Sequence, residues 1–401
     1  MTYELLAPAG DLATARIALR YGADAIYLGG PVLQLRAQKV AFPLEDIRRA
    51  AEEAHHQSRR VYVTVNAFAR DSELELLPAY ARQLQDAGID GAIIADPGVM
   101  SLFHQTVPEM PIHVSTQANC TNAAAARIYY ALGARRVVPA RELTLAQLSE
   151  MRRQLPEDME IEAFVHGAMC MAYSGRCMIS AYLTGRSANR GACAHPCRWN
   201  YTLMEQTRPG EYFPLEETDD GMALFSSRDL NCLPFLEKLV EAGVTSFKIE
   251  GRMKSEYYVA TVLSAYRRRL DDILAGRPSN LNQLTHELDC VSHRTYCSGF
   301  YFGELKHVGG DKGDYLQGCR YIAQVLQVNQ GQAEILLKNK FCAGDTLEAV
   351  TPAGIVAPFP ALQLTDSDGL PVQAASVPDR IYRLNVPAGV TAGDLLRMPL
   401  E

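Results

Sequence analysis

The sequence lacks the features that mark membrane-spanning, secreted and dinucleotide-binding proteins. Its 401 residues contain no apolar run long enough to cross a bilayer. The chain starts without the basic and apolar regions of a signal peptide, so we expect a cytoplasmic protein in a reducing compartment, where disulfides are rare. No Gly-x-Gly-x-x-Gly loop follows the first apolar segment, which disfavours an open nucleotide-binding sheet.

Motifs of familiar hydrolases and radical enzymes are missing as well. Neither His-Glu-x-x-His nor Gly-x-Ser-x-Gly occurs, so the sequence shows no recognisable peptidase apparatus. The spacing Cys-x-x-x-Cys-x-x-Cys, typical of radical enzymes that use S-adenosylmethionine, is also absent. The formal net charge of −7 argues against a general electrostatic attraction of the protein to RNA. Arginine and lysine do cluster locally, and each cluster is either an RNA contact or an ordinary solvated face.

What the sequence does contain is a concentration of cysteine between Glu162 and Trp199. By composition, ten cysteines in the chain would place about one in this stretch, yet it holds four: Cys170, Cys177, Cys193 and Cys197. Converging thiolates can hold an iron–sulfur cluster or a zinc ion, or pair as disulfides. Uneven gaps of six, fifteen and three residues, with glycines between them, favour a cluster seated by loops. Structural zinc and buried free thiols are the alternatives.

Alternating apolar segments and helical stretches over residues 4–275 predict a TIM-like (β/α)8 barrel. In several places a glycine ends a helical stretch and an apolar strand follows directly, as at Gly88 and Gly243, because glycine adopts the left-handed cap conformation readily. The eight expected strands are Glu4–Pro8, Ala25–Gly29, Arg60–Asn66, Gly91–Asp96, Pro111–Gln117, Arg136–Ala140, Glu160–His166 and Ser246–Gly251. An open doubly wound sheet is the alternative.

The barrel architecture predicts where chemistry lies, because active residues of such barrels stand at the carboxyl ends of the strands. Polar residues at those ends include Arg36, Lys39, Asn66, Asp96, Ser115, Gln117, Asn119 and Glu142. We predict catalytic roles for five further residues at strand ends: His113, Arg141, His166, Glu250 and Arg252. Structural histidines, and an ion pair between Glu250 and Arg252 that seals the rim, are the alternatives.

The cysteine stretch begins directly after the seventh expected strand, which would place its ligands over the mouth of the barrel. Roughly eighty residues separate the seventh strand from the eighth, far more than an ordinary connection, and insertions of such length are usually functional. We place this long cysteine-bearing insertion at about residues 167–235, inside a barrel domain of residues 1–275.

The rest of the chain predicts a second, smaller domain. Ser255–Leu274 is expected to form an amphipathic helix, and residues 276–312 a connector whose aromatic segment Gly299–Gly303 either stacks on bases or packs between domains. From 313 to 401, period-two patterns predict a small antiparallel β-barrel, a fold that commonly binds RNA. Four further cysteines are expected to be buried or inert: Cys290, Cys297, Cys319 and Cys342.

The segments Glu162–Cys170 and Gly175–Ser180 resemble the signature of the collagenase-like peptidase family U32. Matching segments also occur at residues 226–230, 248–258 and 338–345, so the resemblance spans most of the chain. A Cys-x-x-x-Cys-Arg-Trp ending to the cysteine stretch and a short carboxy-terminal extension resemble the branch of this family that hydroxylates tRNA.

This resemblance implies an oxygen-independent enzyme that carries a 4Fe-4S cluster and converts the wobble uridine of certain tRNAs to 5-hydroxyuridine, with prephenate as hydroxyl donor. Other branches act on ribosomal RNA or on quinone precursors, and the older family name implies a peptidase. An RNA-binding module with a structural metal is the remaining alternative.

The resemblance also assigns site residues. It implies cluster ligation by the four cysteines of the stretch, with Cys232 as a rival to Cys197, because some relatives use a late cysteine. Prephenate carries two carboxylates, which arginine binds as bidentate pairs. By position, Arg176 and Arg228 are expected to hold it together with Arg141 and Arg252.

Overall fold

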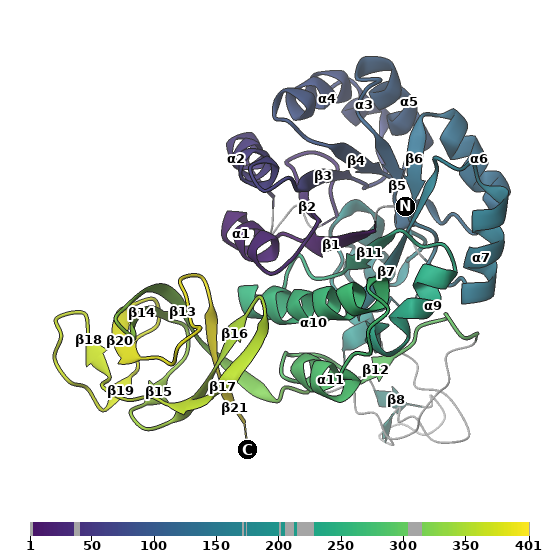
Figure 1. Cartoon of the computed structure of the whole chain (residues 1–401). Helices are drawn as coiled ribbons and strands as arrows, with labels where there is room; N and C mark the ends of the chain where they lie inside the picture. Colours follow the sequence, from purple (N-terminus) through teal and green to yellow (C-terminus); the bar gives the residue numbers. More distant parts are fainter. Residues whose placement is uncertain are drawn as a thin grey trace. The chain divides into compact units, whose positions relative to one another are not determined.

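Figure 1 shows the computed structural model of the chain, which describes residues 3–35, 41–170, 172–173, 175–199, 202–204, 212–214, 228–303 and 315–400. The chain divides into two compact units. The first comprises Met1–Ala15, Asp24–Met253 and Arg294–Tyr315, and the second comprises Arg16–Ala23, Lys254–His293 and Leu316–Glu401. The candidates Arg36 and Lys39 lie outside the described residues.

The first unit is built on a closed barrel of eight parallel strands. The strands are β1 (Glu4–Pro8), β2 (Ala25–Gly29), β3 (Arg60–Val65), β4 (Gly91–Ile94), β5 (Ile112–Val114), β6 (Ala134–Val137), β7 (Glu160–Ala168) and β11 (Ser246–Ile249). Each strand pairs in parallel with the next, and β11 closes the barrel by pairing with both β7 and β1. The (β/α)8 barrel predicted from the sequence is therefore confirmed.

Helices connect consecutive strands and surround the barrel (Figure 1). They are α1 (Leu12–Arg20), α2 (Leu44–His55), α3 (Asp71–Leu74), α4 (Leu77–Asp86), α5 (Pro97–Thr106), α6 (Ala123–Ala131), α7 (Leu145–Gln154) and α9 (Leu236–Glu241). Local chemistry sets their ends. The Asp96 carboxylate accepts the Gly98 and Val99 N–H groups and so starts α5, which makes Asp96 a helix cap. Gly88 and Gly243 follow α4 and α9 with φ of 81° and 86°, as the sequence pattern predicts.

The long insertion follows β7. Its described part contains α8 (Ile179–Thr184), the 3-10 turns η2 (Ala188–Arg190), η3 (Pro196–Arg198) and η4 (Leu233–Phe235), and the strands β8 (Thr202–Met204), β9 (Tyr212–Pro214) and β10 (Asp229–Asn231). Strand β10 returns antiparallel to the end of β7, and β12 (Tyr296–Cys297) pairs with β10 in parallel. The barrel sheet is thus extended beside the insertion.

The second unit combines two helices with an antiparallel sheet, which confirms the predicted small β domain. The helices are α10 (Glu256–Leu274) and α11 (Leu281–Asp289). The seven-stranded sheet has the order β17 (Gly354–Pro360), β16 (Thr346–Thr351), β21 (Leu395–Pro399), β13 (Cys319–Asn329), β14 (Gln332–Leu337), β20 (Ile381–Asn385) and β18 (Thr365–Asp366). Strands β15 (Phe341–Cys342) and β19 (Ala374–Ala375) form a separate pair. Alternate side chains of the sheet, such as Val325 and Ile335, form its apolar core.

The helix expected over 255–274 is present as α10, and its Arg269 side chain is buried and donates to the Ser279 hydroxyl at 3.2 Å. Of the four cysteines expected to be buried or inert, two are buried, and Cys297 is half-buried. Cys290 and Cys319 are buried with their sulfur atoms 2.9 Å apart, whereas Cys342 is exposed.

In the described part of the chain, no helix has both the length and the apolar character needed to span a membrane.

Candidate functional site

A cavity of about 190 Å³ lies at the carboxyl ends of the barrel strands. One part of its wall comes from residues on or just after the strands: Tyr27, Thr64, Asn66, Ser115, Arg141, Phe164, Lys248, Glu250 and Arg252. The other part comes from the insertion: Cys170, Tyr173, Cys177, Asn189, Cys193, His195 and Cys197. The structure therefore brings the cysteine stretch and the strand ends to one place, as the barrel architecture predicts.

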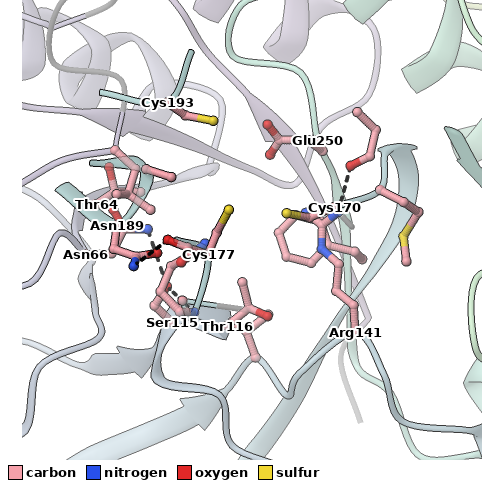
Figure 2. Close-up of a pocket in the computed structure, with 18 of the residues that line it drawn as sticks. Thr64, Asn66, Ser115, Thr116, Arg141, Cys170, Cys177, Asn189, Cys193 and Glu250 are labelled. Atoms are coloured by element: carbon pink, nitrogen blue, oxygen red, sulfur yellow. Dashed lines mark hydrogen bonds between the residues drawn. The ribbon is translucent and has the colours of Figure 1, made fainter. Parts of the chain in front are cut away.

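All four cysteines that were predicted as ligands line this cavity. Figure 2 shows the sulfur atoms of Cys170, Cys177 and Cys193 directed toward a common space. The backbone N–H of His195 donates to the Cys193 sulfur at 3.4 Å. Among the described residues, no three His, Cys, Asp or Glu side chains form, as they stand, a group that could hold a metal ion.

Cys232, the rival to Cys197, lies elsewhere. Its side chain is fully buried at the start of η4, and its backbone N–H donates to the Val165 carbonyl at 2.9 Å. Burial raises the pKa of its thiol well above the usual range, which disfavours the thiolate that binds metals. Cys197 lines the cavity and Cys232 does not, so the position of Cys197 fits the ligand set better.

Close backbone contacts anchor the cysteine stretch to the rim of the barrel. Gly175 has φ of 73°, and a Cβ at this position would lie 2.1 Å from the carbonyl oxygen of Gln117. Only glycine permits this approach. The Asn189 amide donates to the Cys177 carbonyl at 3.0 Å, and the Arg190 guanidinium pairs with Glu73 at 2.9 Å. These contacts hold Cys177 against the cavity wall.

Arg141 and Arg252 bring positive charge to the cavity. The Arg141 guanidinium donates to the Ala168 carbonyl at 2.8 Å and lies 3.7 Å from the centre of the Phe164 ring. Arg252 is buried and donates to Gln34 Oε1 at 3.1 Å, to Thr64 Oγ1 at 3.0 Å and to the Leu35 carbonyl at 2.9 Å. Both guanidinium groups are therefore held in fixed positions.

Glu250 and Asn66 supply polar oxygen atoms to the same cavity. The Tyr27 hydroxyl donates to Glu250 Oε2 at 3.1 Å, and burial together with this carboxylate raises the pKa of Tyr27 well above its usual range. The Asn66 amide donates to the Ser115 hydroxyl at 3.3 Å. Within the described structure, the Asn66 side-chain oxygen is buried and accepts no hydrogen bond, so it is available to a ligand.

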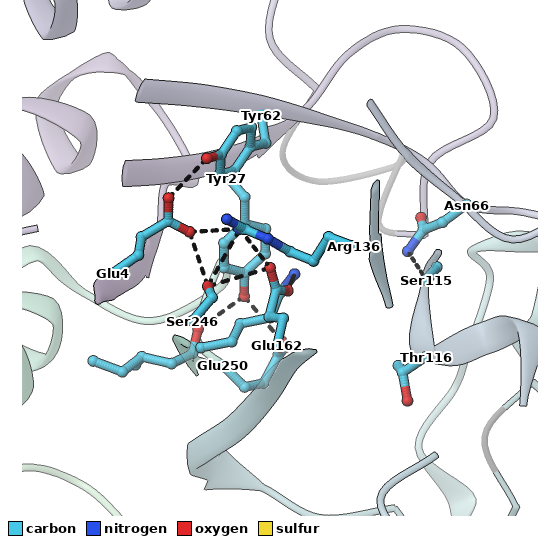
Figure 3. Close-up of polar contacts among 12 residues, drawn as sticks. Glu4, Tyr27, Tyr62, Asn66, Ser115, Thr116, Arg136, Glu162, Ser246 and Glu250 are labelled. Atoms are coloured by element: carbon cyan, nitrogen blue, oxygen red, sulfur yellow. Dashed lines mark hydrogen bonds and ion pairs between the residues drawn. The ribbon is translucent and has the colours of Figure 1, made fainter. Parts of the chain in front are cut away.

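A network of compensating charges lies in the barrel interior (Figure 3). Arg136 contacts Glu4 at 2.5 Å and Glu162 at 3.1 Å, and Lys248 pairs with the other oxygen of Glu162 at 2.8 Å. The hydroxyls of Tyr62 and Ser246 donate to Glu4 at 2.7 and 2.8 Å. Glu162 is buried, and its two carboxylate oxygens pair with Arg136 and Lys248.

Lys248 links this network to the cavity, and sequence reasoning missed it as a site residue. Its ammonium group lies 4.3 Å from the centre of the Tyr27 ring and lines the cavity. Burial lowers the pKa of Lys248, and the Glu162 carboxylate opposes that shift. The available signal was the spacing of Lys248 and Glu250, because alternate residues of a strand face the same side.

The two predicted histidines are not among the residues that line the cavity in the described structure. His113 lies two residues before Ser115, one layer deeper in the barrel, with its ring centre 4.5 Å from that of Tyr62. Burial, reinforced by the positive charges of Arg136 and Lys248, lowers the pKa of His113 well below its ordinary value. The ring of His166 packs 5.5 Å from that of Tyr296 on β12.

Arg176 and Arg228, predicted to hold the co-substrate, also stand outside the described cavity lining. Arg176 is exposed on the cysteine stretch. Arg228 precedes β10, and its carbonyl accepts the Met169 N–H at 3.0 Å. Of the predicted site residues, the structure therefore brings together the four cysteines, Arg141, Glu250 and Arg252.

The described cavity wall carries three cationic side chains, Arg141, Lys248 and Arg252, and one carboxylate, Glu250. An excess of cations in a partly enclosed site favours an anionic ligand. The thiols on the opposite wall are suited to a soft metal or an iron–sulfur cluster. Fold and site together define a (β/α)8-barrel protein with a cysteine-lined cavity at the end where such barrels carry out catalysis.

Comparison with known proteins places this barrel in a family. The profile of Peptidase family U32 matches residues 10–310, and that of the Peptidase family U32 C-terminal domain matches residues 317–397. The chain belongs to peptidase family U32.

Several relatives have names that refer to RNA. The chain is 36% identical over 397 residues to the tRNA hydroxylation protein P of Escherichia coli (strain K12), covering 88% of this chain and 86% of that protein. It is 35% identical over 401 residues to the tRNA hydroxylation protein P1 of Bacillus subtilis (strain 168), covering 98% and 94%. Identity to the 23S rRNA 5-hydroxycytidine C2501 synthase of Escherichia coli (strain K12) is 39% over 274 residues, covering 68% and 40%.

Proposed function

We propose that this protein hydroxylates tRNA, converting the wobble uridine to 5-hydroxyuridine without molecular oxygen. Prephenate is the proposed hydroxyl donor, and a 4Fe-4S cluster is the proposed cofactor. The observation that supports this most directly is that, in the described structure, four cysteines and the cationic side chains at the strand ends line the same cavity. Relatives named for tRNA hydroxylation match the chain over most of its length.

The donor set suits an iron–sulfur cluster. Cys170, Cys177, Cys193 and Cys197 provide four sulfurs around one space, and a backbone N–H already donates to one of them. Hydrogen bonds to cluster sulfurs tune the reduction potential. When bound through all four cysteines, such a cluster would supply electron transfer, and one of its irons would act as a Lewis acid only after a cysteine ligand leaves. Because the side chains do not form a metal-holding group as they stand, cluster binding would draw the four described thiols together.

The cationic side chains would bind the two carboxylates of prephenate. Of the four arginines expected to bind the donor, we retain Arg141 and Arg252, because these two line the cavity in the described structure and Arg176 and Arg228 do not. Arg252 is held by three acceptors, so it can meet a carboxylate without losing much side-chain entropy. Glu250, oriented by the Tyr27 hydroxyl, and the Asn66 oxygen would orient hydroxyl and amide groups of the reactants.

The target base would have to leave any stack to reach this cavity, because the reacting carbon of a stacked base is not accessible to a buried site. An unpaired loop nucleotide needs the least energy for that movement. A wobble uridine lies in such a loop. Action on tRNA would also place the enzyme in the cytoplasm.

Ribosomal RNA is a second candidate substrate, and one observation favours it. The relative that makes 5-hydroxycytidine in 23S rRNA is 39% identical, although the match covers only 40% of that protein. The same analysis tests both substrates. Nucleosides from the tRNA and rRNA of a deletion strain are measured by mass spectrometry, before and after complementation with the intact gene.

The proposal predicts that 5-hydroxyuridine and its derivatives disappear from tRNA in the deletion strain and return on complementation, with rRNA unchanged. Loss of 5-hydroxycytidine from rRNA alone would move the assignment to rRNA. Unchanged nucleosides in both RNA classes would refute the proposed function.

A further inference from the structure

The cysteine stretch differs in charge from the rest of the chain. The formal net charge of the protein is −7, yet no aspartate or glutamate occurs between Ala163 and Met204. The same segment contains four arginines: Arg176, Arg186, Arg190 and Arg198. Arg176 and Arg186 are exposed, whereas Arg190 is engaged with Glu73. A positive surface therefore stands beside the cavity in an otherwise acidic protein.

Large apolar and aromatic side chains are exposed on the same segment. Tyr182 is 88% exposed, Met178 69%, Tyr173 62% and Trp199 48%. Such a concentration of exposed rings within one short stretch marks an interaction site rather than ordinary surface. Tyr173 also lines the cavity, so one of these exposed rings lies at the cavity wall.

The rings are carried by an ordered scaffold. Helix α8, which bears Tyr182, packs against η3, which Trp199 directly follows. The Ser180 hydroxyl donates to the Arg186 carbonyl at 2.6 Å and accepts the Ala194 N–H at 3.0 Å, which ties α8 to the segment around Cys193. Tyr182 and Trp199 are thus held on the structure that also carries the cavity cysteines.

We propose that this surface, defined by Tyr173, Tyr182, Arg186 and Trp199, binds the unpaired nucleotides of the substrate RNA that flank the target base. Aromatic rings stack on bases of any sequence, and arginines pair with the intervening phosphates. The absence of acidic residues between positions 163 and 204 removes the repulsion that a phosphate backbone would meet elsewhere on this acidic chain. The inference rests on the proposed function and adds to it the place where RNA is held.

The chain offers a direct optical probe of this surface, because Trp199 is its single tryptophan. The full-length protein is titrated with a short RNA hairpin that has an unpaired loop and, in parallel, with a fully paired RNA duplex of equal length. Tryptophan fluorescence and the anisotropy of labelled RNA are both recorded. We expect the hairpin to bind more tightly than the duplex and to quench Trp199, because stacked bases quench indole emission.

Two substitutions separate stacking from charge. Tyr182→Ala should raise the Kd for the hairpin at least about fivefold, whereas Tyr182→Phe, which keeps the ring, should stay close to wild type. Arg186→Ala should reduce the slope of log K against log salt by about 0.7, the value for one phosphate contact with a single strand. Matched controls are Ile128→Ala in α6 and Arg49→Ala in α2, both exposed and outside this surface, which should leave hairpin binding unchanged.

Equal binding of hairpin and duplex, or an unchanged Kd in Tyr182→Ala, would overturn the inference. If Tyr182→Ala instead dissociates an oligomer in light scattering and leaves RNA affinity intact, the surface is a contact between copies of the chain. A failure of the proposed function gives a different result from a failure of this inference. If only the proposed function is wrong, the hairpin still binds through Tyr182, but the deletion strain retains its hydroxylated nucleosides.

Discussion

At the scale of single residues, buried charges in the barrel interior compensate one another and extend to the cavity. Glu162 joins Arg136 and Lys248, and Lys248 in turn faces the ring of Tyr27 beside the proposed substrate. Removing one member of such a group leaves an unpaired charge in a medium of low polarity. Catalytic placement and stability therefore depend on the same side chains.

Lys248→Met tests this dependence. The substitution keeps an apolar stem but leaves Glu162 without its lysine partner, so the free energy of unfolding should fall by about 3 kcal/mol. Lys338→Met is the matched control, because Lys338 forms a more exposed pair with Asp379 at 2.9 Å and should contribute at most about 1 kcal/mol. Denaturant unfolding of both variants measures the difference, and equal losses would contradict the account.

His113 makes stability depend on pH. Burial, then the charges of Arg136 and Lys248, lowers the pKa of His113 well below its ordinary value of 6.5. Below about pH 6.5 the unfolded chain takes up a proton at this histidine that the folded chain does not. The free energy of unfolding therefore decreases as the pH is lowered, by up to about 1.4 kcal/mol per pH unit.

His113→Gln should therefore flatten the decline in stability between about pH 6.5 and 5. His56→Gln, at an exposed site in the turn after α2, should leave the decline as it is. Denaturant unfolding at several pH values gives both slopes. A slope in His113→Gln equal to that of wild type would show that this side chain does not control the pH response.

At the scale of elements, the alternation of apolar segments and helical stretches was sufficient to locate the barrel strands, and at four of them a helix-ending glycine, such as Gly88 or Gly243, directly precedes the strand. The rule that active residues stand at the carboxyl ends of barrel strands correctly placed Arg141, Glu250 and Arg252 at the cavity. The rule failed for His166, because the pairing of β11 with β7 shifts by one residue between Lys248 and Ile249. A bulge of this kind redirects side chains, and a single sequence gives no sign of it.

The anchoring of the cysteine stretch gives a prediction at this scale. A methyl group at Gly175 would collide with the Gln117 carbonyl, so Gly175→Ala should displace Cys177 and lower the iron content by more than half. Gly185→Ala is the control in the same stretch. Gly185 also has a positive φ, 69°, but no atom lies within 4 Å of its added Cβ. In both variants alanine has to adopt a left-handed backbone conformation, which costs about 1 kcal/mol of stability, and only Gly175→Ala adds the collision.

Iron assay after anaerobic purification compares the two glycine variants. Equal iron in both proteins would show that the contact with Gln117 does not position the cysteine ligands.

At the scale of the whole molecule, the sequence predicted a barrel, a cysteine-bearing insertion and a smaller β domain, and the structure contains all three. It could not predict which polar side chains meet, because convergence at the cavity depends on strand register and on how the insertion folds back. Asn66 follows β3, Lys248 lies on β11 and Asn189 lies in the insertion, and they line one cavity only in three dimensions.

The central claim is that four cysteines from the insertion hold an iron–sulfur cluster above the barrel. The most direct test is the iron and sulfide content of the anaerobically purified protein, measured for wild type and for Cys170→Ala, Cys193→Ala and Cys197→Ala. Cys232→Ala serves as control, because Cys232 is buried away from the described cavity lining. The account predicts about four irons per chain in wild type and in the control, and loss of iron and of tRNA hydroxylation together in the other three. Zinc in place of iron, or iron that persists in Cys197→Ala and disappears in Cys232→Ala, would contradict it.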